Sequence, residues 1–170
     1  MAIREDRKEQ IMDKALGIFA ERGYYKATTA LVAKAAGVTQ PYVFHFFLNK
    51  KALYIALLDR AMHRIYDLLE DVEAPVSQLE NTLGSAFRSG MSMYRDEILL
   101  VMQSYSISEP VIREHARALF QSIHDFISVK FQKANVPNAK QATSRFMAAG
   151  YLITVSEMLD VQSLVSFKTE

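Results

Sequence analysis

Residues 40–47 gather side chains that bind other molecules by stacking and hydrogen bonding, and they read Gln-Pro-Tyr-Val-Phe-His-Phe-Phe. On a helix of two turns, Val43 and Phe47 lie four residues apart and can fill the one buried face. The other large groups then face solvent, and they are Tyr42, His45 and Phe46. Large exposed aromatic groups on a short helix indicate a surface that meets a partner. The alternative for any one of them is packing beneath the next helix.

Two adjacent lysines, Lys50 and Lys51, are expected in the first turn of that next helix. Free backbone N–H groups and the helix dipole favour negative charge in a first turn, so two ammonium groups there are unfavourable unless an anion compensates. A phosphate at this helix end would be held by the N–H groups and by the lysines. Two solvated surface lysines are the alternative.

The charge distribution around these residues also favours a polyanionic partner. Residues 1–51 carry nine Lys and Arg against five Asp and Glu, whereas the whole chain has a net charge of only +1. From Arg22 to Lys51 there are five basic residues and no acidic one. A stretch without acids suits the phosphate backbone of nucleic acid, although a short window can lack acids by chance.

Side chains for catalysis or metal binding are sparse. The chain has no cysteine, which excludes disulfides and thiolate metal sites and favours a reducing compartment. No two of its four histidines share a helical turn, and they are His45, His63, His115 and His124. Local spacing therefore shows neither a metal cage nor a nucleophile beside a base. We expect no metal, no cofactor and no enzymatic activity.

The chain is expected to be a soluble, cytoplasmic protein of one compact unit, or of a small module that shares its core with a larger one. Residues 1–10 alternate charges without an apolar run, and no stretch approaches the ~20 apolar residues of a membrane span. Half of the 170 residues are hydrophobic, which is enough for a real core. We expect no membrane partner.

Helical periodicity runs through nearly the whole chain, so the expected fold class is all-α. The first helix is expected over residues 7–22, with Asp6 and Glu9 as a capping box and Gly23 as its stop. A long helix is expected over residues 49–71, opened by a hydrophobic staple of Leu48 and Leu53. Prolines then separate the last expected helices, which cover residues 76–94, 96–107, 110–134 and 138–159.

Two short helices lie between these, over residues 29–36 and 40–46. Thr29 is the expected N-cap of the first and Thr39 that of the second, where Pro41 is tolerated in the first turn. The tight turn over residues 37–39 makes the pair a helix-turn-helix, whose second helix would enter the major groove of DNA.

These residues resemble the DNA-binding signature of the tetracycline-repressor (TetR) family of transcription regulators. The similarity covers about residues 7–58 without a gap, and its segments are Thr28-Thr29, Val32-Ala33, Ala36-Gly37-Val38-Thr39, Val43-Phe44-His45-Phe46-Phe47 and Asn49-Lys50-Lys51-Ala52-Leu53. The resemblance implies an N-terminal three-helix DNA-binding domain, residues 1–48, and a C-terminal helical domain for ligand binding and dimerisation, residues 49–170. It also implies a palindromic double-stranded DNA operator as partner.

The resemblance further implies which side chains contact DNA, and they are Thr29, Thr39, Gln40, Pro41, Tyr42, His45, Phe46 and Lys50. Thr29 would cap its helix against a phosphate, and Lys50 would hold another phosphate. Gln40 can pair with adenine through two hydrogen bonds, and apolar faces can meet the thymine methyl group. The chain departs from the family at Phe44 and Phe46, where tyrosines are usual, and at Ala30, which cannot read a base.

Methionine and aromatic residues in the C-terminal two thirds can line an adaptable apolar cavity, although ordinary core is the alternative for each. The expected lining is Phe87, Met91, Tyr94, Met102, Tyr105, Phe120, His124, Met147 and Tyr151. Small residues within residues 146–159 favour close helix approach and a homodimer interface.

The function implied by the resemblance is a repressor that a small hydrophobic effector releases from its operator. A two-fold dimer would place its reading helices in successive major grooves, ~34–36 Å apart, and the effector would favour a conformer with another spacing. A ligand-independent DNA-binding protein and a transcriptional activator of the same fold remain the alternatives.

Overall fold

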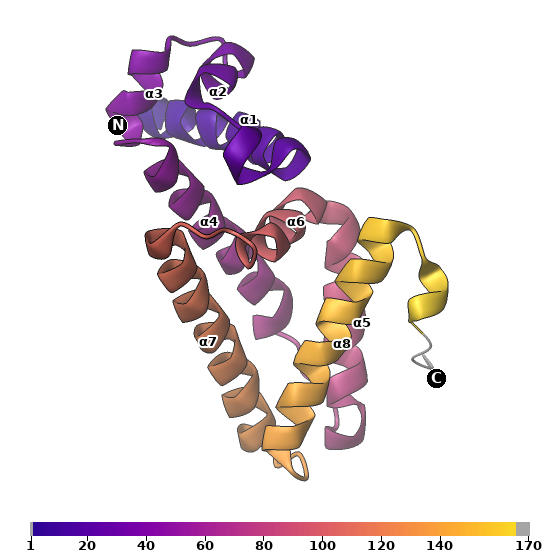
Figure 1. Ribbon diagram of the computed structural model, residues 1–170. Helices are drawn as coiled ribbons and strands as arrows, with labels where there is room; N and C mark the ends of the chain where they lie inside the picture. The colour runs from indigo at the N-terminus through magenta and orange to yellow at the C-terminus, as the bar shows by residue number, and fades with distance from the viewer. Residues whose placement is uncertain (1, 166–170) are drawn as a thin grey trace.

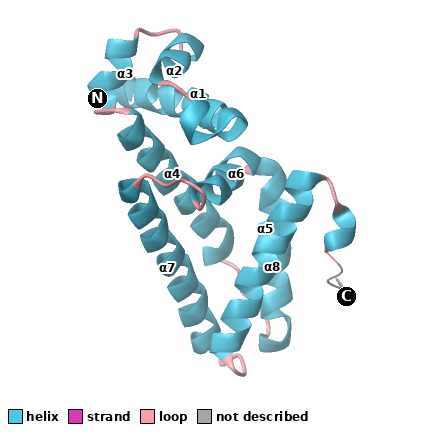
Figure 2. Ribbon diagram, viewed as in Figure 1, coloured by secondary structure: helices cyan, strands magenta, loops and turns pink. Residues whose placement is uncertain are grey.

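The computed structural model describes residues 2–165, and this range is helical with no strand (Figure 2). The fold is therefore all-α, as predicted. Its elements are α1 (Ala2–Lys26), α2 (Thr29–Ala35), α3 (Gln40–Phe46), α4 (Lys50–Glu70), α5 (Val76–Met93), α6 (Arg95–Ser104), α7 (Pro110–Lys133), α8 (Ala139–Leu159) and the short 3-10 helix η1 (Gln162–Leu164). The expected helix ends agree with these bounds within three residues, except at α1.

Helix α1 begins well before the predicted start, so the proposed capping box of Asp6 and Glu9 was wrong. Both residues lie inside the helix, because nothing in the preceding residues breaks it. Gly23 does interrupt α1, with φ 71° and ψ 166°, a conformation that is essentially restricted to glycine. One more turn, ending at Lys26, follows this break.

Of the two predicted helix caps, the one at α3 is confirmed and the one at α2 was wrong by one residue. Thr39 caps α3, since its hydroxyl accepts a hydrogen bond from the backbone N–H of Tyr42 at 3.3 Å. Helix α2 is capped by Thr28 and not by Thr29, because the Thr28 hydroxyl accepts from the N–H of Leu31 at 3.2 Å. Thr29 is thereby free for a different contact.

Helix α4 runs from the α1–α3 module into the rest of the molecule (Figure 1). Asn49 caps it by accepting a hydrogen bond from the N–H of Ala52 at 2.9 Å. The expected hydrophobic staple is absent, because Leu48 is 84% exposed while Leu53 is fully buried. The side-chain cap alone therefore defines where α4 begins.

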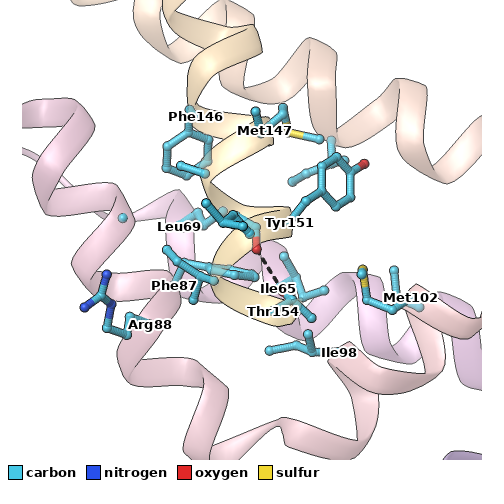
Figure 3. A pocket seen from close by; sticks show the side chains of 18 of the residues that line it. Ile65, Leu69, Phe87, Arg88, Ile98, Met102, Phe146, Met147, Tyr151 and Thr154 are labelled. Atoms are coloured by element: carbon cyan, nitrogen blue, oxygen red, sulfur yellow. Dashed lines mark hydrogen bonds between the residues drawn. The ribbon is translucent and has the colours of Figure 1, made fainter. Parts of the chain in front are cut away.

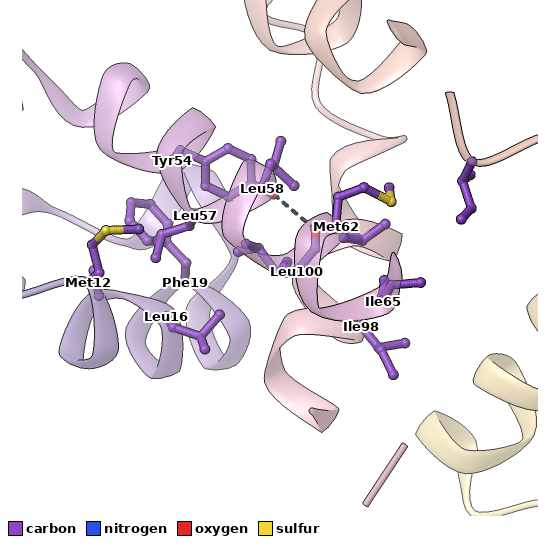
Figure 4. Packing of buried hydrophobic residues seen from close by; sticks show 14 of the residues in the cluster. Met12, Leu16, Phe19, Tyr54, Leu57, Leu58, Met62, Ile65, Ile98 and Leu100 are labelled. Carbon is purple, nitrogen blue, oxygen red and sulfur yellow. Dashed lines mark hydrogen bonds between the residues drawn. The ribbon is translucent and has the colours of Figure 1, made fainter. Parts of the chain in front are cut away.

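The remaining helices form a bundle in which α6 crosses between α1 and the group of α5, α7 and α8 (Figure 1). The core continues through the whole molecule: Figure 4 shows Phe19 of α1, Tyr54 of α4 and Leu100 of α6 packed together. The division into residues 1–48 and 49–170 stays a proposal, because buried side chains continue across it.

Candidate functional site

The outward face of α3 is exposed. Val43 is fully buried and Phe47 is 5% exposed, whereas Tyr42 is 39% exposed and His45 is also open to solvent. Gln40 and Pro41 lie on the same open side of the chain at the start of α3. The predicted burial of Val43 and Phe47 and the predicted exposure of Tyr42 and His45 are confirmed, whereas Phe46 is half-buried and packs against the core.

The rings on this face support one another. The Tyr42 and His45 rings stack with centroids 6.2 Å apart, and the Phe46 ring meets the Tyr42 ring edge-on at 5.4 Å. The Arg4 guanidinium lies 5.9 Å from the centroid of the half-buried Phe46 ring. The start of α1 therefore brings a positive charge to α3, which sequence reasoning missed because no spacing rule connects the two.

The Gln40 side chain is hydrogen-bonded to the first residue of α2. Its Nε2 donates a hydrogen bond to the hydroxyl of Thr29 at 2.8 Å, and Thr29 is only 7% exposed. Thr29 was expected to cap α2 against a phosphate. Thr29 is instead largely buried, and its hydroxyl accepts the hydrogen bond from Gln40, an exposed residue of α3.

The two lysines at the start of α4 differ from expectation. The Lys50 Nζ donates to the backbone carbonyls of Tyr24 at 2.8 Å and Ala27 at 3.1 Å, and it lies 4.4 Å from the Tyr24 ring centroid. The Lys51 Nζ pairs with Glu109 at 3.0 Å. Carbonyl oxygens at the end of α1 therefore compensate the charge of Lys50, and a carboxylate compensates that of Lys51. The Lys50 ammonium group already donates to these carbonyls.

A cavity of about 650 Å³ lies among α4, α5, α6, α7 and α8 (Figure 3). This volume is within the ~300–1,000 Å³ of small-molecule pockets. Six of the nine expected lining residues are in its wall: Phe87, Met102, Tyr105, Phe120, Met147 and Tyr151. Sequence reasoning missed Ile65 and Leu69, because a cavity wall and an ordinary core have the same apolar pattern.

Three expected lining residues lie elsewhere. Met91 is buried against Thr154, with its sulfur 4.0 Å from the hydroxyl oxygen. The Tyr94 ring lies 5.5 Å from the Arg64 guanidinium, and His124 contacts Asp125 at 3.2 Å. None of the three lines this cavity: Tyr94 and His124 contact residues outside its wall, whereas Met91 packs against Thr154, a wall residue, without lining the cavity itself.

The polar groups of the cavity are few. Burial raises the pKa of Tyr105, and the neighbouring Tyr151 adds to this shift. Burial likewise raises the pKa of Tyr151, so both hydroxyls stay protonated at neutral pH and are able to donate hydrogen bonds. The one ion pair in the wall joins Arg145 to Glu80 at 3.0 Å, on exposed side chains. The interior therefore suits an apolar group.

Helix α6 contacts both the cavity and α1. Met102 lines the cavity, while the neighbouring Gln103 donates from its Nε2 to the carbonyl of Ala20 at 2.8 Å. The Tyr54 hydroxyl of α4 donates to the carbonyl of Leu100 at 3.2 Å, the dashed line in Figure 4. A displacement of α6 would therefore act directly on α1 and α4.

Comparison with known proteins gives this arrangement a family. Residues 11–57 match the model of the bacterial regulatory proteins of the tetR family. The tetracycline repressor protein class D of Escherichia coli is 35% identical over 91 residues, which are 52% of this chain and 41% of that repressor. The chain belongs to the TetR family.

Two further relatives extend the similarity of this TetR-family chain to most of its length. The transcriptional activator FasR of Mycolicibacterium smegmatis is 22% identical over 156 residues, 90% of this chain and 70% of that activator. The structure of FadR from Bacillus subtilis, in complex with stearoyl-CoA, has a TM-score of 0.71 and 17% identity, covering 89% of this chain and 88% of that one. This second likeness shows the fold.

The TetR-family chain is a DNA-binding transcription regulator of the helix-turn-helix type, and TetR-family regulators are not enzymes. Within residues 2–165, no helix combines the length and the apolar character needed to cross a bilayer.

Proposed function

We propose that the outward face of α3 reads operator DNA in the major groove and that the cavity binds an apolar effector that releases the DNA. The observation that carries this proposal is the open face of a well-capped α3 in a region without acidic residues. An exposed polar and aromatic helix face beside excess positive charge suits a duplex.

Within this face, we assign base contacts to Gln40, Pro41 and Tyr42, with His45 and Phe46 on neighbouring bases or backbone. Thr39, the N-cap of α3, would lie near a phosphate. Lys50 no longer belongs to the phosphate contacts, because its ammonium group already binds backbone carbonyls. Arg4, which is exposed beside Phe46, replaces it as a basic side chain beside the reading helix.

The effector class that the cavity favours is a molecule with a long or bulky apolar part. The wall is mostly apolar, and of its charged residues Arg88 and Arg145 are exposed while Glu80 is half-buried. FadR of Bacillus subtilis binds stearoyl-CoA on the same fold, so fatty acyl-CoA thioesters are the first ligands to test. The exposed Arg88 side chain in the wall suits the charged end of such a molecule, whereas Arg145 is already paired with Glu80.

Release of DNA requires the effector to bind one conformer better than the other, because equal affinity shifts no equilibrium. Helix α6 is the element that carries the change in this proposal. Met102 and Tyr105 would move with the ligand, and Gln103 would transmit the shift to the carbonyl of Ala20 in α1.

Homodimerisation through α8 completes the proposal. Met147 and Tyr151 line the cavity, and Ala148 and Leu152 border the same cavity but are exposed on the helix. Leu159 is 64% exposed at the end of the helix. This open apolar side is the surface that a second copy would cover.

The direct test is a selection of duplexes bound by the full chain from a random DNA pool. We expect a palindrome whose half-site centres lie about 10 base pairs, or a multiple of that distance, apart.

A panel of acyl-CoA thioesters of increasing chain length is then added to the complex. Chain-length-dependent release supports the effector class, and transcription in vitro with and without the ligand gives the sign of regulation. A pool without enrichment would contradict DNA reading itself.

A further inference from the structure

The contact between Thr29 and Gln40 joins two helices of the reading motif. Thr29 is the first residue of α2 and is 7% exposed, while Gln40 is the first residue of α3 and is exposed. The Gln40 Nε2 donates to the Thr29 hydroxyl at 2.8 Å. A buried hydroxyl therefore holds the end of a side chain that otherwise lies in solvent.

This contact uses one of the three hydrogen-bonding groups of the Gln40 amide. A glutamine amide has two N–H donors on its nitrogen and one carbonyl acceptor, and the Thr29 hydroxyl takes one N–H. The second N–H and the carbonyl oxygen remain available, and they form a side-by-side pair when Thr29 takes the N–H that is trans to the carbonyl oxygen. Adenine presents the matching pair in the major groove, since its N7 accepts and its N6 donates.

We propose that Thr29 is a positioning residue for sequence reading: its hydroxyl orients the Gln40 amide so that the free N–H and the carbonyl oxygen meet adenine. The inference rests on the proposed DNA-reading function of α3. A free glutamine must lose several rotamers when it binds a base, and a side chain that is already held loses fewer. Guanine presents two acceptors there and cannot satisfy the outward carbonyl oxygen.

The neighbouring threonine shows that Thr29 is not needed to cap its helix. Thr28 caps α2 by accepting from the N–H of Leu31, and no hydrogen bond joins Thr28 to Gln40 in the described part of the chain. The two adjacent threonines therefore divide two tasks, helix capping and side-chain orientation. This division provides a matched control.

The test compares base preferences of the full-length protein and its variants on the selected operator. The Gln40→Ala variant first identifies the base pair that Gln40 reads. It is the operator position at which this variant no longer prefers one base pair over another. Wild-type protein is expected to prefer A·T there by about 5- to 150-fold over G·C. Thr29→Val keeps the branched shape without the acceptor, and Thr29→Ser keeps the acceptor.

We expect Thr29→Val to lose most of the preference at that base pair, to about twofold, with preferences elsewhere in the operator unchanged. Thr29→Ser should retain the wild-type preference. Thr28→Val should lower the melting temperature and leave the preference intact, because it removes a cap only. Thr29→Ala serves as a second variant should Thr29→Val fold poorly.

Two results would overturn the inference: a Thr29→Val protein with the wild-type preference, or one that binds every sequence more weakly by the same factor. In the second case Thr29 would act on affinity and not on reading. Failure of the wild-type protein to select any duplex is a different outcome, because it would remove the proposed function together with this inference.

Discussion

At the scale of single residues, Lys50 shows how a side chain that looks free in the sequence becomes part of the framework. Its ammonium group binds the carbonyls of Tyr24 and Ala27, which follow the break in α1 at Gly23. These carbonyls lie where a helix end leaves acceptors without partners inside the helix. Lys50 therefore fastens the end of α1 to the start of α4.

Lys50→Met should destabilise the protein by about 1.5–3 kcal/mol, because it leaves half-buried carbonyl groups without a charged donor. Urea unfolding followed by circular dichroism measures this change. Lys51→Met is the matched control in the same helical turn. It breaks an ion pair between side chains that are 35% and 37% exposed, so its unfolding midpoint should stay close to that of the wild type. Equal midpoints for the two variants would contradict the assigned role of Lys50.

The buried hydroxyl of Tyr54 predicts a fall in stability at alkaline pH. Burial raises the pKa of Tyr54 above its usual value of about 10, so its stabilising contribution is complete below pH 10 and is lost as the pH rises further. The melting temperature is expected to fall above about pH 10. Tyr54→Phe removes the hydrogen bond to the Leu100 carbonyl, so the free energy of unfolding at pH 7 should decrease by about 0.5–1.5 kcal/mol. The melting temperature of this variant should fall less steeply at high pH than that of the wild type. Parallel curves for the two proteins would rule out Tyr54 as the cause.

At the scale of helices, the break at Gly23 decides where the end of α1 lies. A residue with a side chain is strained at φ 71° and ψ 166°, so Gly23→Ala should cost about 1–3 kcal/mol. Gly84 in the interior of α5 provides the control, because a Cβ there meets no atom within 4 Å. Gly84→Ala should stabilise the protein by up to about 1 kcal/mol. Thermal melts of both variants check the opposite signs, and a stable Gly23→Ala protein would contradict the strain.

The elements that could be predicted from the sequence were those with local causes. The bounds of α3 follow from the Thr39 cap and from the buried pair Val43 and Phe47, which are close in the chain. Residues whose partners are distant in the chain could not be predicted in the same way. Lys50 contacts carbonyls 23 and 26 positions away, and Thr29 meets a side chain 11 positions away.

The cavity shows the same limit in a different form. Aromatic composition marked Phe87, Phe120 and Tyr151 as candidate lining residues, but a packed core and a hollow one have the same composition. Only the spacing of the helices decides which inward residues enclose space. Met91 and His124 have side chains of the types that line such cavities, but neither lies in the cavity wall.

At the scale of the whole molecule, α6 between the cavity and α1 predicts reciprocal coupling of effector and DNA. If an acyl-CoA weakens operator binding by a factor, the operator must weaken acyl-CoA binding by the same factor, typically about 5- to 150-fold. Titrations in both directions measure the two factors. Equal acyl-CoA affinity of free and operator-bound protein would show that the cavity does not control DNA binding.

The central claim, that the open face of α3 lies against duplex DNA, is tested most directly by photocrosslinking. A light-activated p-benzoylphenylalanine replaces His45 in one protein and Val129, exposed near the far end of α7, in another. Each protein is irradiated with the selected duplex at low salt. The account predicts crosslinks to operator bases from position 45 and none from position 129. Crosslinking from position 129, or none from position 45 although the protein binds the duplex, would contradict it.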